Sequence, residues 1–113
     1  GNRFVTRLKP QYFEFAKPLD EISLISDGSK LTLKSGDKFG VKNSFKIKSL
    51  KNVRVNVIGY GTKSIDESEQ EVAKNSLSKS YSIDKDGKIY RVEFYKNEDG
   101  KEKFAGMILA EFR

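Results

Sequence analysis

The stretch "KIYRVEFYKNEDGKEKFAGMILAEF" (residues 88–112) predicts two strands joined by a tight turn. In its first half Tyr90, Val92 and Phe94 alternate with polar residues, the period of a half-buried strand. The Asp-Gly pair at 99–100 is a dipeptide that two-residue hairpin turns favour. The apolar residues of the second half that share a face are Phe104, Ile108, Ala110 and Phe112. This end of the chain therefore predicts an antiparallel hairpin.

The same alternation recurs upstream. In "NVRVNVIGYG" (52–61) three valines lie on one face, and in "NSFKIKSL" (43–50) two apolar residues alternate with two lysines. Asp-Gly at 27–28 predicts a turn between two short apolar segments, and a further short strand is expected at 11–16. About seven short strands separated by turn signals are typical of an antiparallel sandwich or barrel.

One segment departs from this pattern. "SIDESEQEVAKNS" (64–76) is acidic and shows no alternation. Asp66 stands three residues before Glu69, and Ser68 three before Glu71, which is the spacing of a helix-capping box. A short helical insert is therefore expected near 65–75.

The length of 113 residues corresponds to one domain. Two prolines interrupt the first stretch, so residues 1–19 are interpreted as a linker or as a leading strand from a preceding domain, and 20–113 as the β domain. The chain begins with Gly1, so we expect targeting information to lie outside it. No apolar run is long enough to span a bilayer.

Histidine and cysteine are both absent. The chain therefore lacks the residues for Ser-His-Asp or Cys-His catalysis and for an ordinary zinc site. It also lacks cysteines for disulfide bonds. No cofactor and no metal is expected.

Positive charge is concentrated in the first half of the chain. Residues 1–60 contain 12 Lys and Arg against 5 Asp and Glu, whereas residues 61–113 contain 10 against 11. A lysine recurs at every fourth position from Lys30 to Lys46, but glycines interrupt the segment, so the series is not one continuous line. The residues predicted to form a basic contact face are Lys42, Lys46, Lys48 and Arg54.

A basic face has two readings. Its lysines can simply solubilise a sheet and discourage edge pairing. Alternatively they bind an anionic polymer, such as nucleic acid, a phosphate-bearing glycan or an anionic lipid surface. The aromatic motifs of nucleic-acid modules are absent, which disfavours nucleic acid. A second candidate contact is the hairpin loop, with Asn97, Glu98, Asp99 and Lys101.

Candidate catalytic or ligand-binding motifs have simpler explanations. Asp84 and Asp86 begin a stretch that lacks the glycine and glutamate of a calcium loop. "GYGTKS" (59–64) lacks the spacing of a nucleotide-binding loop. Glu93 and Glu111 form the pair of carboxylates that a small hydrolase would use, although ion pairing with a residue such as Arg91 explains them as well.

The stretch "DGKIYRVEF" (86–94) resembles part of an immunoglobulin-like domain. Asp86 stands four residues before Tyr90, and Val92 takes the place of the usual cysteine, as in a tyrosine corner. The tryptophan and disulfide of antibody domains are missing. The resemblance implies an all-β, antiparallel immunoglobulin-like β-sandwich over residues 20–113.

The lysine-rich, cysteine-free chain that opens with "GNRFVTRLKP" is also similar to the C-terminal accessory domain of bacterial cell-shape peptidoglycan carboxypeptidases. This resemblance implies a non-catalytic module of a periplasmic or cell-envelope protein. Such a module would position a neighbouring domain, or hold a protein partner or an anionic cell-wall polymer. The alternative hypotheses are a basic β-barrel that binds nucleic acid or another polyanion and, last, a hydrolase using Glu93 and Glu111.

Overall fold

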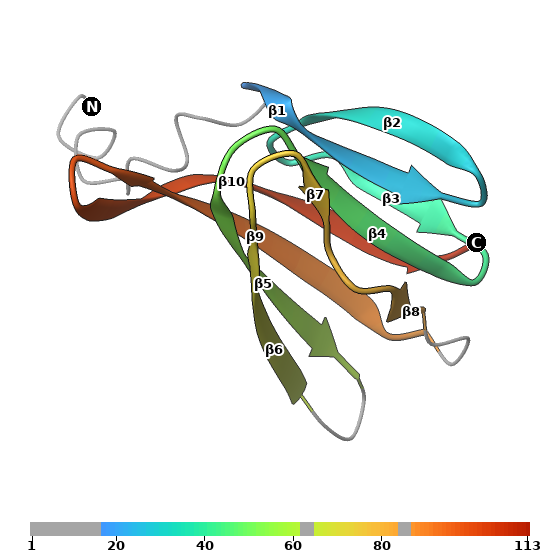
Figure 1. Ribbon diagram of the computed structural model, residues 1–113. Coiled ribbons are helices and arrows are strands. Elements are labelled where there is room, and N and C mark those ends of the chain that lie inside the picture. Colours follow the sequence, from blue (N-terminus) through green and yellow to red (C-terminus); the bar gives the residue numbers. More distant parts are fainter. Residues whose placement is uncertain (1–16, 62–64, 84–86) are drawn as a thin grey trace, which may run out of the picture.

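The computed structural model describes residues 17–61, 65–83 and 87–113, and this part of the chain forms ten β-strands (Figure 1). They are β1 (Pro18–Ser26), β2 (Ser29–Lys34), β3 (Lys38–Val41), β4 (Ser44–Ser49), β5 (Val53–Tyr60), β6 (Ile65–Val72), β7 (Ser76–Leu77), β8 (Tyr81–Ser82), β9 (Ile89–Glu98) and β10 (Lys101–Phe112). Within these ranges there is no helix long and apolar enough to cross a membrane.

The strands form two sheets. Sheet A has the order β2-β1-β4-β7, with β8 also pairing with β4, and sheet B has the order β3-β10-β9-β5-β6. Neighbouring strands are antiparallel except for β3 and β10, which are parallel. The sheets pack face to face, as Figure 1 shows. The predicted all-β sandwich is therefore confirmed, and the barrel alternative is not the observed architecture.

The core lies between the sheets and follows from the alternation in the sequence. Leu24 of β1 and Ile47 of β4 are directly opposite each other in sheet A, and both are fully buried. Sheet B contributes Val55, Phe94 and Ile108, which are also fully buried. Each such side chain contributes roughly 1.5–3 kcal/mol when it is removed from water. The lysines that alternate with these residues consequently face outward.

Two predicted turns are confirmed by their backbone conformation. Asp27 and Gly28 join β1 to β2 with φ of 51° and 80°, and Asp99 and Gly100 join β9 to β10 with φ of 54° and 77°. Positive φ at both central positions is the hairpin geometry that Asp-Gly favours.

The helical insert predicted near 65–75 is wrong. Residues 65–72 form β6, which pairs with β5 over eight successive positions from Val53↔Val72 to Tyr60↔Ile65. The physical reason is that backbone pairing with β5 and burial of Val72 outweigh the weak local preference of an acidic segment for a helical turn.

Three predictions fall wholly or partly outside the described residues. They are the strand at 11–16, the Asp84/Asp86 segment and the Asp86 half of the tyrosine corner. Tyr90 is described: it lies in β9, half-buried, and packs against the core. The assignment of 1–19 as linker or leading strand remains a proposal; β1 begins at Pro18.

Candidate functional site

Four lysines share the outer face of sheet A. Lys30 and Lys34 lie on β2 and alternate with Leu31 and Leu33, which face the core. Lys46 and Lys48 lie on β4, and β1 separates them from β2. We call the four residues Lys30, Lys34, Lys46 and Lys48 the lysine face.

The strand register brings these lysines together. Ile25 of β1 pairs with Lys30 on one side and Lys46 on the other. Adjacent strands lie about 4.8 Å apart, so the backbone positions of Lys30 and Lys46 are separated by ~10 Å. Lys34 and Lys48 continue the two edges of this surface. Its dimensions suit several anionic groups of one extended ligand.

The side chains of the lysine face are not ion-paired. The positions paired across β2, β1 and β4 include no Asp or Glu. Among the described residues, none of the four lysine side chains makes a hydrogen bond or an ion pair, and a carboxylate beside them, that of Asp37, accepts a hydrogen bond from the backbone N–H of Lys34 at 2.9 Å. Lysines that do form ion pairs include Lys38 with Glu111 at 3.1 Å, Lys88 with Asp66 at 2.6 Å, Lys103 with Glu98 at 3.4 Å and, between the two sheets, Lys96 of β9 with Glu21 of β1 at 2.9 Å. The lysine side chains on one side of the sandwich are thus left without ion pairs.

Arg54 does not lie beside Lys46 and Lys48, and that expectation is wrong because β5 belongs to sheet B. Its guanidinium donates two hydrogen bonds to Glu102, at 2.9 and 2.6 Å, and one to Glu69 at 3.0 Å. It also lies 4.2 Å from the centre of the Tyr95 ring. The hydrogen bond to Glu102 raises the pKa of Arg54 further above its usual value. Its charge is therefore compensated within sheet B.

Lys42 lies in the two-residue connection between β3 and β4 and is exposed. Its backbone N–H donates to a carboxylate oxygen of Asp27 at 3.5 Å. Lys42 therefore lies beyond the end of the strands that carry the lysine face, next to a negative charge.

The β9–β10 hairpin presents the predicted loop contact. Asn97 and Glu98 end β9, Asp99 forms the turn, and Lys101 begins β10; all four are exposed. They lie at the end of the sandwich that also contains the start of β1. We call this the hairpin end.

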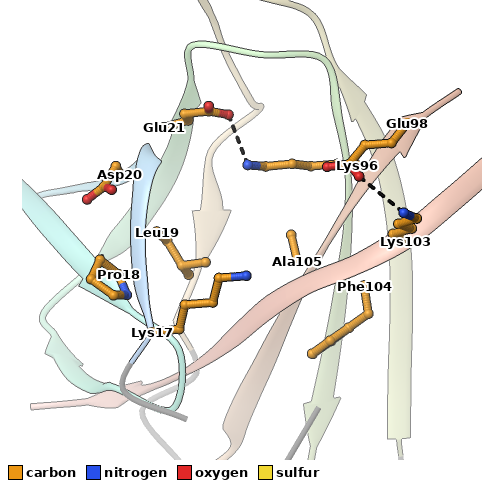
Figure 2. Close-up of a pocket in the computed structure, with 10 residues that line it drawn as sticks. All are labelled: Lys17, Pro18, Leu19, Asp20, Glu21, Lys96, Glu98, Lys103, Phe104 and Ala105. Carbon is orange, nitrogen blue, oxygen red and sulfur yellow. Dashed lines mark hydrogen bonds and ion pairs between the residues drawn. The ribbon is translucent and has the colours of Figure 1, made fainter. Parts of the chain in front are cut away.

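The hairpin end contains a pocket, drawn in Figure 2. Its volume is about 430 Å³, and its walls come from the start of β1, the end of β9 and the start of β10. Lys96 crosses one side of it to form the ion pair with Glu21. The hydrogen bond from Lys96 lowers the pKa of the Glu21 carboxyl. A second pocket, of about 330 Å³, is also lined by Glu21 and Lys96 and includes Lys51 and Asn52. The Lys96–Glu21 ion pair therefore lines both pockets.

The carboxylates Glu93 and Glu111 are not brought together. Glu93 pairs with Met107, which is four residues from Glu111 along β10, so their backbone positions are ~13 Å apart. Glycosidase pairs stand about 5–9.5 Å apart. Glu93 accepts hydrogen bonds from Asn56 and Tyr95 and an ion pair from Arg91, as expected. Structural ion pairing accounts for both glutamates.

Lys30 and Lys34 belong to this face although the sequence pattern did not predict them there. Their alternation with Leu31 and Leu33 was a usable signal for which side they face. What the sequence could not reveal is that β2 and β4 both pair with β1, since this is a long-range property of the sheet.

The chain was compared with known proteins. No curated protein sequence matches it significantly. Three solved structures of Csd4 from Helicobacter pylori match it: the mDAP-bound form, described as a D,L-carboxypeptidase, the product-bound form and the apo form of this cell shape determinant protein. Each is 32% identical over 88% of this chain, with TM-scores of 0.56, 0.55 and 0.56. The match covers 24%, 23% and 23% of those chains, so this chain spans about a quarter of their length.

The family described as the C-terminal domain of metallo-carboxypeptidase matches residues 15–113. This range includes every described strand. The suspected similarity to the C-terminal domain of the cell-shape carboxypeptidases is therefore confirmed, and the chain belongs to the family of metallo-carboxypeptidase C-terminal domains.

Proposed function

We propose that this domain is the non-catalytic accessory module of a cell-wall carboxypeptidase in the periplasm or cell envelope. Its role is to hold a neighbouring domain in position. Membership of the C-terminal-domain family supports this, as does similarity to about a quarter of a D,L-carboxypeptidase that binds mDAP. By extension, the complete enzyme acts on cell-wall peptides that contain diaminopimelate.

The metal of a metallo-carboxypeptidase does not fit this domain. The chain contains no histidine and no cysteine. The described ranges also contain no group of three or more metal-ligating side chains that could hold an ion. We therefore assign the metal, and the reaction that depends on it, to another part of the enzyme.

The positioning role is supported by the place at which the chain enters the fold, which is the hairpin end. The chain enters the described fold at Lys17, which lines the pocket of Figure 2. A domain that precedes residue 17 would therefore be joined to the fold at this end. The pocket walls combine apolar surface from Leu19 and Phe104 with exposed charges such as Asp20 and Lys103. Mixed surfaces of this kind are typical of contacts between domains of one chain.

The test uses the double variant Asp20→Lys/Lys103→Glu in the full-length carboxypeptidase. Both side chains are exposed, so the 113-residue chain should keep its melting temperature. In the full-length enzyme, calorimetry should show one coupled unfolding transition for the native protein and two separate transitions for the variant.

The control is Lys30→Glu, at the far end of sheet A beside the β1–β2 turn. It also reverses a charge, and it should leave the coupled transition intact. If the pocket variant remains coupled, or if the native enzyme already unfolds in two independent transitions, the hairpin end does not contact the neighbouring domain.

A further inference from the structure

We propose that the lysine face binds the carboxylates of the cell-wall polymer and keeps the enzyme on its insoluble substrate. This inference rests on the proposed function and names a second contact of the same module. The observation behind it is that the side chains of four lysines on paired strands form no ion pair, whereas Lys38, Lys96 and Lys103 each pair with a glutamate.

The geometry of the face suits a repeating anion. Lys30 and Lys46 stand on either side of Ile25, and Lys34 and Lys48 extend the two rows. The long side chains of lysine can adapt to ligand groups spaced by ~10 Å or more. Peptides that contain diaminopimelate carry carboxylates, and a polymer presents them many times. Several weak exposed ion pairs then act together through multivalency.

The composition of the face argues against nucleic acid. Binding to single-stranded nucleic acid uses aromatic side chains as stacking platforms. The outward positions of β2, β1 and β4 contain no aromatic side chain; besides the lysines they include Thr32, Ser23, Ile25 and Ser44, and the exposed Pro18 and Asp20 lie at the start of β1.

A lipid surface also fits poorly. Peripheral membrane binding combines basic residues with a broad apolar surface that enters the headgroup region. Beside the lysine face, Leu77 on β7 is exposed and Ile25 is half-buried, and they lie on different strands. A carboxylate polymer, by contrast, can be bound by positive charge without an aromatic or apolar surface.

The test is cosedimentation of the 113-residue chain with purified, insoluble peptidoglycan sacculi. The variant is Lys34→Gln/Lys46→Gln/Lys48→Gln, and the matched control is Lys51→Gln/Lys74→Gln/Lys101→Gln, which removes the same charge from exposed positions off this face. At about 50 mM salt the face variant should bind ~10-fold more weakly, as expected when three exposed ion pairs are lost, and the control within about twofold of the native chain.

Chemical blocking of the polymer identifies the group that is bound. The native chain should bind sacculi whose carboxylates have been converted to neutral amides as weakly as the face variant binds untreated sacculi. Raising the salt to about 300 mM should weaken the binding of the native chain and of the control variant to untreated sacculi, because exposed charges are screened.

Three results would overturn the proposal: equal binding of the face variant and the control, undiminished binding to the amidated sacculi, or tighter binding to single-stranded DNA or phosphatidylglycerol vesicles. Failure here is distinguishable from failure of the positioning role. The lysine variants should leave the coupled unfolding of the full-length enzyme unchanged, whereas the Asp20/Lys103 variant should leave sacculus binding unchanged.

Discussion

Gly106 lies in β10 where the strand bulges, and its φ of 150° is one that other residues rarely adopt. A Cβ atom there would stand 2.8 Å from Leu19 Cδ2 and 3.0 Å from Ser35 Oγ. Ser35 in turn accepts a hydrogen bond from the backbone N–H of Met107. The glycine therefore permits β10 to approach the strands of sheet A at the floor of the hairpin end.

Replacing this glycine should destabilise the fold. We expect Gly106→Ala to lower the free energy of unfolding by ~1–3 kcal/mol, because the new methyl group overpacks a buried contact and the backbone is strained. Urea denaturation measures the change. Gly28→Ala is the control: its φ of 80° is also positive, but a Cβ atom there would meet nothing within 4 Å, so it adds backbone strain without overpacking. Equal losses in both variants would contradict the argument.

At this scale the sequence predicts what local chemistry determines. The Asp-Gly turns at 27–28 and 99–100 follow from the backbone freedom of two adjacent residues. The role of Gly106 does not, since it depends on Leu19 and Ser35, which are about 70 to 90 positions away in the chain. The pairing of Arg54 with Glu102 was hidden for the same reason.

At the scale of elements, β6 is an edge strand that contacts the core at one end. Val72 is 2% exposed and belongs to the core, whereas Ile65, at the other end of the same strand, is 67% exposed. Between them lies a run of polar and acidic residues that pair with β5 through their backbones. Acidic residues on an edge strand also discourage pairing with another chain.

These two positions should respond differently to the same kind of truncation. Val72→Ala should cost ~1–3 kcal/mol of unfolding free energy, because methyl groups are removed from a packed core. Ile65→Ala should change it by less than about 0.5 kcal/mol, as for other exposed positions. Denaturant melts of the two variants provide the comparison, and a larger effect at Ile65 would mean that this end of the strand is covered.

Elements with alternating patterns were predictable and β6 was not. Strands such as β5 and β9 bury one face, so their sequences record the period of two. In β6 most side chains contact solvent, so its sequence shows no alternation of apolar and polar residues. The spacing of its acidic residues therefore suggested a helix cap instead. Long-range pairing, not local preference, determines its conformation.

At the scale of the whole molecule, charge is distributed between the two sheets. Cations of sheet B such as Lys38, Arg54 and Arg91 form ion pairs with glutamates, whereas the side chains of the lysine face form none. Acid removes the compensation by protonating the carboxylates and leaves 22 Lys and Arg side chains to repel one another. The stability of the sandwich should therefore depend on the carboxylates that hold its cations in place.

Glu102 is the position at which to test this. Its hydrogen bond with Arg54 lowers the pKa of the carboxyl below the ordinary value of 4.5. A lowered pKa in the folded state stabilises the protein above the unfolded value, and this contribution is lost as the pH falls below about 4.5 through the folded value. We therefore expect Glu102→Gln to lower the melting temperature at about pH 6 and the difference from the native chain to shrink at about pH 3.

The second half of the test removes the partner. In an Arg54→Gln background the same Glu102→Gln change should no longer produce a difference in melting temperature that shrinks with acid, because the hydrogen bond that lowers the pKa is gone. Melting curves of the four proteins at both pH values complete the cycle. A pH-dependent difference that persists without Arg54 would show that other groups lower the pKa of Glu102. The stability of sheet B would then not depend on the Arg54–Glu102 pair.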